Sequence, residues 1–370
     1  MTGIFLALLL LSVSSWYGRA HGYSHGQLLP RVDSGNCTRF IVSGSIPGYF
    51  QNHAFYDFRQ LGDYASASPP AKITSKQDSG DENVTSTYFN TTAFQGWNIL
   101  SGVRSDESTV PMIYSAQNIF ISDANSSDDG AATYLSLRTS RLSAFQSMAE
   151  IKSTSDNYLH ASLRIRAKFL ASSDADVASG AVFGFFTYKT DNQESDIEIL
   201  TAEDADTVHF TNQPASDEDE AAHAIVSLPD GKHWTDWVTY RLDWFNGTSA
   251  WYIDDEPKVQ STDSVPTEPS SVVLNLWSNG QSFSGKMAVG KEVLVAVEWI
   301  EMVYNVSDSQ VNTASPVTCK VDGVSVTGQA EVVVESKSKS NAIRRSEQTT
   351  TSFLGVILAA LFLAGSFDLV

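Results

Sequence analysis

The sequence has few cysteines and few basic residues. Of its 370 residues only 2 are Cys and 24 are Lys or Arg, against 43 Asp or Glu, so the formal net charge is -19. Two cysteines are too few for a disulfide scaffold, and they lack the spacing of a zinc finger. The low basic content argues against a nucleic-acid binder, whose affinity comes from Lys and Arg on phosphates. A neutral polymer stays open as a ligand.

Several motifs are also missing. The sequence shows no phosphate-binding loop, no HExxH metal motif and no Ser-His-Asp arrangement, so we expect neither a cofactor nor a metal. What it does have is a hydrophobic share of 42% with 11% aromatics, enough for a sizeable core. Its length allows one large all-β domain or two medium ones.

The two ends of the chain resemble targeting signals. Ile4–Leu11 is a short apolar run within residues 1–20, which predicts a secretory signal peptide; a buried core helix is the alternative. Phe353–Val370 is a second apolar run, preceded by a polar spacer and small residues. This order is typical of a glycosylphosphatidylinositol signal over 341–370, removed on maturation, with Ser340 as the attachment residue. A permanent single-pass helix is the alternative, but no basic residues follow the tail.

These signals predict a cell-surface or cell-wall protein held to the outer leaflet of the plasma membrane by a lipid. In an oxidising compartment a bond between Cys37 and Cys319 would tie together the ends of the main domain. The chain-entropy model gives such a bond roughly 5 kcal/mol, and two free buried thiols are the alternative. Asn-X-Ser/Thr sequons provide possible glycan sites at Asn36, Asn83, Asn90, Asn125, Asn246 and Asn305.

Strand-like runs separated by turns dominate the region between the signals, and helical periodicity is hard to find. Clear examples are Tyr134–Thr139, Ala161–Phe169, Ala181–Tyr188, Trp237–Trp244 and Val272–Trp277. This density of strands predicts a monomeric two-sheet β-sandwich over residues 21–310. Residues 311–340 lack aromatics and are rich in Ser, Thr, Val and Lys. They predict a short strand or two around Cys319 and then a flexible stalk.

One strand-like segment, Gln193–Leu200, carries an unusual row of acidic residues. Side chains alternate along a strand, so Glu194, Asp196 and Glu198 share one face and the apolar Ile197 and Ile199 take the other. Like charges this close repel one another, so the row is costly unless it serves a function. A solvated acidic face is the alternative.

Such a row suits cleavage of a glycosidic bond, which needs two carboxyl groups in different protonation states. The Cα atoms of Glu194 and Glu198 would lie about 13 Å apart on a strand. Their flexible side chains can lean toward the roughly 5–5.5 Å separation of a retaining enzyme. Asp196 between them can hold a proton and keep the two pKa values apart. This geometry favours retention over inversion.

The segment Glu194-Ser-Asp196-Ile-Glu198 resembles the E-x-D-x-E signature of glycoside hydrolase family 16. The resemblance extends over about residues 90–305, and the segment is similar to the regular-strand version of the signature. Thr201 and Asn212-Gln213-Pro214 resemble secreted fungal members. Other segments similar to the family, in the same order, are Tyr158–Lys168, Gly180–Tyr188, Trp237–Trp244, Trp251–Asp254 and Leu274–Gly280.

The resemblance implies a concanavalin-like β-jelly-roll, a sandwich of two antiparallel sheets with a substrate groove on the concave face. It implies that Glu194 is the nucleophile, Asp196 the assisting carboxylate and Glu198 the general acid/base. The expected activity is retaining, endo-acting cleavage of β-glucan with β-1,3 or mixed β-1,3/1,4 linkage. A transglycosylase would use the same residues. A non-catalytic carbohydrate-binding wall protein is the alternative from another class.

Other residues are candidates for contact with the polysaccharide. Aromatic side chains stack on the apolar faces of sugar rings, which makes Trp277 and Trp237 candidates, with core packing as the alternative. Asn212 and Gln213 are candidates for hydrogen bonds to sugar hydroxyls, with a turn role as the alternative. Glu150 and Arg138, outside this set, are polar strand residues that a surface salt bridge would explain equally well.

Overall fold

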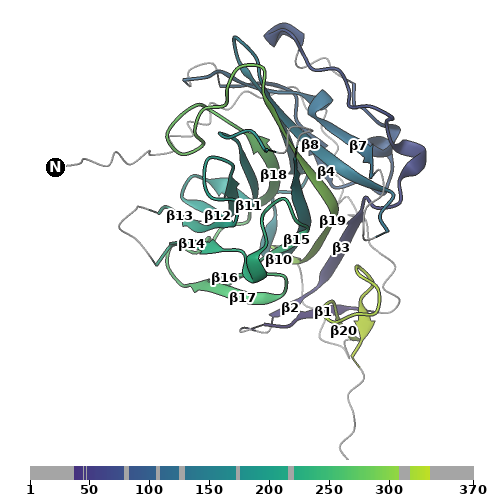
Figure 1. Cartoon of the computed structure of the whole chain (residues 1–370). Helices are drawn as coiled ribbons and strands as arrows, with labels where there is room; N and C mark the ends of the chain where they lie inside the picture. Colours follow the sequence, from purple (N-terminus) through teal and green to yellow (C-terminus); the bar gives the residue numbers. More distant parts are fainter. Residues whose placement is uncertain are drawn as a thin grey trace, which may run out of the picture. The chain divides into compact units, whose positions relative to one another are not determined.

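The computed structural model describes residues 37–44, 46, 48–78, 83–105, 109–124, 130–171, 176–215, 221–307 and 317–333. Within these ranges the ordered elements are β-strands and short 3-10 helices, which confirms the predicted all-β class. The strands form one small sheet and one large continuous sheet, which folds into two layers that face each other and are called the two large sheets below (Figure 1). The 3-10 helices are Gly62–Tyr64, Lys76–Asp78, Thr87–Asn90, Ala116–Asn118 and Pro229–Gly231.

The first large sheet, called here the carboxylate sheet, contains the acidic strand near its middle. The acidic strand, β12, is antiparallel to both of its neighbours, and Figure 1 shows β11, β12 and β13 side by side. In spatial order the strands are β4 (Trp97–Ile99), β9 (Gln146–Ser153), β18 (Ser271–Trp277), β11 (Val182–Thr190), β12 (Gln193–Leu200), β13 (Thr207–Gln213) and β14 (His223–Ser227).

The second large sheet, called the opposing sheet, is built around two long strands, β19 (Glu292–Val306) and β10 (Tyr158–Leu170). Strand β9 passes between the sheets, because its start pairs with β8 and its end pairs with β18. The remaining strands on this side are β3 (Asn52–Asp57), β5 (Gly102–Ser105), β6 (Met112–Tyr114), β7 (Ile119–Asp123), β8 (Thr133–Arg141), β15 (Val238–Phe245), β16 (Thr248–Ile253) and β17 (Glu256–Ser261).

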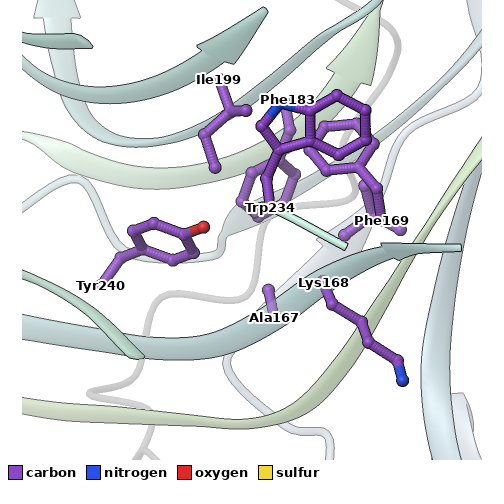
Figure 2. Close-up of a pocket in the computed structure, with 8 residues that line it drawn as sticks. Ala167, Lys168, Phe169, Phe183, Ile199, Trp234 and Tyr240 are labelled. Atoms are coloured by element: carbon purple, nitrogen blue, oxygen red, sulfur yellow. The ribbon is translucent and has the colours of Figure 1, made fainter. Parts of the chain in front are cut away.

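The main core lies between the two large sheets. Ile197 and Ile199 of β12 point into it, as the alternation predicted, and meet apolar side chains of the opposing sheet. Figure 2 shows Ile199 with Phe183, Trp234 and Tyr240 around a gap that is too small to hold a water molecule. Because the inner face of β12 is fixed by this packing, its carboxylates are committed to the outer face.

The small sheet brings the two ends of the domain together. Cys37 and Cys319 form a disulfide bond, the pairing expected from the sequence. The strands of this sheet are β1 (Arg39–Val42), β2 (Gly48–Phe50), β20 (Thr318–Lys320) and β21 (Glu331–Val332). The compact unit therefore continues to Val333, past the predicted domain end at residue 310. Residues 317–333 of the predicted stalk belong to this unit, because β20 pairs with β1 and Cys319 is buried.

The predicted signal peptide, the attachment residue Ser340 and the predicted anchor signal lie outside the described residues. Within the described ranges, no helix has the length and apolar character needed to span a membrane.

Candidate active site

The acidic row of β12 is buried on the outer face of the carboxylate sheet. Glu194 is 9% exposed and Asp196 only 2%, while Glu198 is half-buried. The three residues pair across to Tyr188, Phe186 and Gly184 of β11, so this strand supplies the adjacent surface. A solvated acidic face would leave these side chains in water. Their burial instead makes each negative charge costly.

Burial and mutual repulsion act on all three carboxyl groups. Burial, and then the charge of Glu198, raises the pKa of Glu194, and burial raises the pKa of Glu198 to about 7. Burial and the charges of both glutamates raise the pKa of Asp196 well above its ordinary value. The centre therefore retains protons at a pH where isolated carboxyl groups would have lost them.

A hydrogen bond joins Asp196 and Glu194 within the row. It lowers the pKa of Glu194, against the effect of burial, and raises that of Asp196. Gln213 also contacts this centre: it lies opposite Glu194 on β13 and hydrogen-bonds the carboxyl of Asp196. Its Oε1 accepts from the backbone N–H of Ala215 at 3.0 Å, which leaves its NH₂ group as the donor.

A second polar group lies on the same face, on the side toward β18 and β9. Strand pairing sets the order of its residues across the sheet. Glu198 of β12 is opposite Gly184 of β11, which is opposite Asn275 of β18, which in turn is opposite Glu150 of β9. Asn275 Nδ2 donates to Glu150 Oε2 at 3.3 Å, and the Tyr114 hydroxyl donates to the same oxygen at 3.1 Å. Burial raises the pKa of Glu150. These polar groups lie in direct line with Glu198 on the carboxylate face.

Gly184 makes this arrangement possible. A Cβ atom at residue 184 would lie 2.8 Å from Asn275 Oδ1, so any side chain there would displace the amide. The sequence analysis did not predict the group formed by Asn275, Tyr114 and Glu150. For Glu150 it considered a surface salt bridge an equally good explanation. The structure buries Glu150 on the carboxylate sheet, whereas Arg138 lies on β8 and donates from Nε to Asn118 Oδ1 at 3.0 Å.

On the other side of Glu198, β13 contributes histidine. His209 pairs with Glu198 in register, and its Nε2 lies 2.7 Å from Glu203 Oε2. Its ring centroid is 5.4 Å from that of His223 on β14. His209 is a residue of β13, and its side chain lies on the carboxylate face because it stands opposite Glu198.

Trp277 lies on the carboxylate face at the end of β18. Only 6% of it is exposed, and it packs in an apolar cluster with Met148, Val182 and Leu200. The ring of Phe283 stacks on it with 6.4 Å between centroids. Trp277 is in line with Leu200, which is two residues past Glu198 on β12. The ring therefore lies on the carboxylate face, beyond the end of the carboxylate row.

Two predicted substrate contacts are corrected. Asn212 points to the inner side of β13: its Oδ1 accepts from Ser195 Oγ at 2.7 Å and its Nδ2 donates to the backbone oxygen of Asp263 at 2.9 Å. These two hydrogen bonds hold Asn212 on the inner side of the sheet, beneath the carboxylate row. Trp237 precedes β15 in the opposing sheet, where Lys168 Nζ lies 4.7 Å from its ring centroid. It is on the far side of the core from Glu194.

The sequons differ in accessibility. Asn83, Asn90 and Asn246 are exposed, so a glycan could be attached without moving the fold. The Asn305 side chain is half-buried, accepting from Gln51 N at 3.0 Å. Asn36 and Asn125 lie outside the described residues.

No group of three or more His, Cys, Asp or Glu side chains in the described ranges has the geometry of a metal site. A β-sandwich with a buried carboxylate row on one outer face is a class of protein suited to chemistry on sugars.

Comparison with known sequences identifies the family. The sequence profile described as Glycosyl hydrolases family 16 matches residues 113–301, which include β12, and the chain belongs to this family. It is 29% identical to a beta-glucanase of Paenibacillus polymyxa over 137 residues, 34% of this chain and 55% of that protein. It is 31% identical to a beta-glucanase of Bacillus subtilis over 107 residues, 27% of this chain and 42% of that protein. The chain thus spans about half the length of these curated relatives.

Solved structures give a weaker likeness. The Bacillus licheniformis beta-glucanase aligns with a TM-score of 0.46 and 21% identity, covering 59% of this chain and 96% of that one. A prokaryotic beta-1,3-1,4-glucanase (lichenase) from a mouse hindgut metagenome aligns with a TM-score of 0.47 and 20% identity, covering 69% and 99%.

Proposed function

We propose that the protein is a retaining, endo-acting glycoside hydrolase that cleaves β-glucan with β-1,3 or mixed β-1,3/1,4 linkage. The observation that carries the proposal is the buried row on β12, in which Asp196 is hydrogen-bonded to Glu194 and burial raises the pKa of Glu198. The row thus holds two glutamates on one face, one available for attack on the sugar and one for proton donation. Family membership and the two bacterial beta-glucanases support the choice of substrate.

The mechanism uses two displacements at the anomeric carbon. In the first, an ionised Glu194 oxygen attacks that carbon while Glu198 gives its proton to the departing glycosidic oxygen, so a covalent glycosyl-enzyme forms. Glu198, now a carboxylate, takes a proton from water as the water attacks, and Glu194 leaves as a carboxylate. The hydrogen bond from Asp196 favours the charged form of Glu194 in which each cycle begins and ends.

We place the enzyme at the cell surface or in the cell wall as a glycosylated, lipid-anchored monomer. This part of the proposal rests on the apolar runs at both ends of the sequence and on the sequons. An anchored enzyme is better suited to remodelling the organism's own wall than to digesting external glucan.

A transglycosylase would pass through the same glycosyl-enzyme, with a sugar hydroxyl in place of water. The decisive experiment is incubation of the purified protein with laminarin, with lichenan and with a labelled oligosaccharide acceptor, followed by mass spectrometry of the products. Shortened chains support the hydrolase and identify its linkage, whereas labelled products longer than the acceptor indicate a transglycosylase. Glu194→Gln is the inactive control. Binding without either product would overturn the enzymatic proposal in favour of a carbohydrate-binding wall protein.

The stereochemistry can be followed in the same reaction. If Glu194 forms a covalent intermediate, NMR at early times should show the β-anomer as the first product. Initial release of the α-anomer would contradict the double displacement.

A further inference from the structure

Arg104 is a half-buried cation on β5, next to the polar group of the carboxylate face. It precedes residues 113–301, which the family profile matches. It is the extra residue of a β-bulge, because β5 advances two residues from Val103 to Ser105 while its partner β6 advances one. Bulges redirect a side chain, and here the guanidinium hydrogen-bonds the side chain of Tyr114.

A guanidinium can only donate hydrogen bonds, and this fixes the direction of each bond in the polar group. The Tyr114 oxygen accepts from Arg104, so its hydroxyl proton goes to Glu150 Oε2 at 3.1 Å. The same Oε2 also accepts from Asn275 Nδ2 at 3.3 Å. Burial raises the pKa of Glu150, and the charge of Arg104 acts in the opposite direction, which favours the carboxylate that only accepts.

The amide oxygen of Asn275 is therefore turned toward Glu198. It is buried and has no hydrogen-bond partner in the described ranges. It lies above Gly184, 2.8 Å from the position that a Cβ of residue 184 would occupy, and Gly184 is opposite Glu198 on β12. Opposite side chains of an antiparallel pair are about 4.5–5.5 Å apart at Cβ. The oxygen thus takes the place of the side chain that would neighbour Glu198.

Titratable groups surround Glu198 on its other sides. Asp196 and Glu194 share its face of β12. His209 is opposite on β13, and its Nε2 lies 2.7 Å from Glu203 Oε2. The amide oxygen lies on the side toward β11. An acceptor in that position favours the protonated form of Glu198, whereas an N–H donor would favour its carboxylate.

We propose that Arg104 is a positioning residue for the proton-donating step, because it fixes the direction of the hydrogen bonds so that Asn275 presents an acceptor to Glu198. This inference rests on the proposed function, since it takes Glu198 as the acid. Without Arg104, the buried Glu150 would bind a proton and donate a hydrogen bond to the amide. The amide would then turn over and direct its NH₂ group toward Glu198, which would lower the pKa of Glu198.

The test is an NMR titration of the Glu198 carboxyl in protein labelled with 13C-glutamate, without substrate, in which Glu198→Gln identifies the resonance. Arg104→Met should lower the midpoint by about one pH unit. Arg104→Lys keeps a group that can only donate and should shift the midpoint less. Loss of positive charge alone would act in the opposite direction, as the charge of Arg104 lowers the pKa of Glu194. The sign of the shift therefore separates the two effects.

Two further variants show whether Arg104 acts through the amide. In the Asn275→Ala protein, Arg104→Met should no longer lower the midpoint, because the amide that turns over is absent. Arg59→Met removes a guanidinium that pairs with Asp57 next to the opposing sheet, and it should leave the midpoint unchanged. Thermal unfolding checks that each variant is folded, and Arg104→Ala replaces Arg104→Met if the latter is not.

The kcat/KM for a short oligosaccharide is then measured against pH. Its decline above about pH 7 should begin about one unit lower in Arg104→Met. A Glu198 midpoint that stays or rises in folded Arg104→Met would overturn the positioning role and leave the proposed catalysis standing. An equal fall in Arg104→Lys, in Arg59→Met or in the Asn275→Ala background would overturn it as well. A lowered midpoint in a protein that never cleaves glucan would support the role of Arg104 but overturn the proposed function.

Discussion

Two clusters of buried charge in this molecule are built in opposite ways. On β12 the charges have one sign: Glu194, Asp196 and Glu198 face the same side. The second cluster, called here the ion cluster, lies between the opposing sheet and the small sheet and mixes both signs. Arg164 Nη1 lies 2.7 Å from Asp322 Oδ1 and 3.2 Å from Glu301 Oε2. Arg241 Nη2 lies 2.6 Å from Asp243 Oδ2.

The difference separates chemistry from stability. In the ion cluster each of these carboxylates has an arginine close by, and Asp322 joins the segment after β20 to the sheet beneath it. Such pairing holds the structure in one state. The carboxylates of β12 lack a cation at that distance among the described residues. Burial raises their pKa values, so they can exchange protons near neutral pH. Removing charge should therefore affect activity at one cluster and stability at the other.

The largest expected effect is on activity. Glu194→Gln removes the nucleophile and should lower kcat by at least about 10³-fold on glucan, as measured by release of reducing ends. Because the change also removes one of three repelling groups, the thermal midpoint should stay the same or rise. A variant that loses activity because it unfolds would contradict the distinction between the clusters.

The largest effect on stability should come from the ion cluster. Arg241→Leu leaves Asp243 buried without its partner and should lower the free energy of unfolding by about 3–5 kcal/mol in urea titration. Lys258→Ala removes an exposed pair with Glu256 and should cost less than about 1 kcal/mol. Equal costs for the two variants would show that the buried pairs are dispensable.

Loss of the disulfide should have a similar or smaller effect. The bond joins residues 282 positions apart, so Cys37→Ser with Cys319→Ser frees a very long loop in the unfolded chain. We expect a loss of about 2–5 kcal/mol in unfolding free energy, with kcat of the remaining folded protein unchanged. A fall in kcat at temperatures where the variant is fully folded would indicate that the small sheet shapes the carboxylate face.

The stability of the protein should also depend on pH. The pKa values of Glu194 and Glu198 rise from 4.5 to about 8 and about 7, so the folded protein binds more protons than the unfolded chain between these limits. Stability should therefore fall as pH rises through this window, by about 1.4 kcal/mol per pH unit for each proton. Glu194→Gln should flatten the slope, and Glu256→Gln on the surface should leave it unchanged. A slope equal in all three proteins would contradict burial of the row.

The same shift of Glu198 bears on catalysis. Because it must carry a proton to act as the acid, kcat/KM should decline above about pH 7. A pH profile of initial rates on a short oligosaccharide checks this, and a plateau to pH 9 would argue against Glu198 as the acid.

Local pattern was enough to predict part of this structure. The alternation in Gln193–Leu200 places Ile197 and Ile199 in the core and the carboxylates on the other face, because side chains of a strand must alternate. The all-β class followed from strand density in the same way. The two cysteines pair because β1 and β20 run side by side.

Contacts between strands that are distant in the sequence could not be predicted from local pattern. Glu150 and Asn275 are 125 residues apart and meet only because β9 and β18 are neighbours. Asn212 and Gln213 are adjacent in sequence, yet the strand turns Asn212 inward and Gln213 toward Asp196. Because side chains alternate along the strand, only Gln213 lies on the face that can contact a substrate. Gly184 carried the missing signal, since a glycine within a strand marks a close approach by another group.

The central claim is that Glu194 forms a covalent bond to the sugar. It is tested most directly with a 2-deoxy-2-fluoro glucosyl oligosaccharide that carries a good leaving group, because the fluorine slows release of the intermediate. After incubation, intact mass and peptide mapping should show one fluorinated oligosaccharide, without its leaving group, attached to the peptide that contains Glu194, and none in Glu194→Gln. Attachment to Glu198, or full turnover of the natural substrate by Glu194→Gln, would contradict the account.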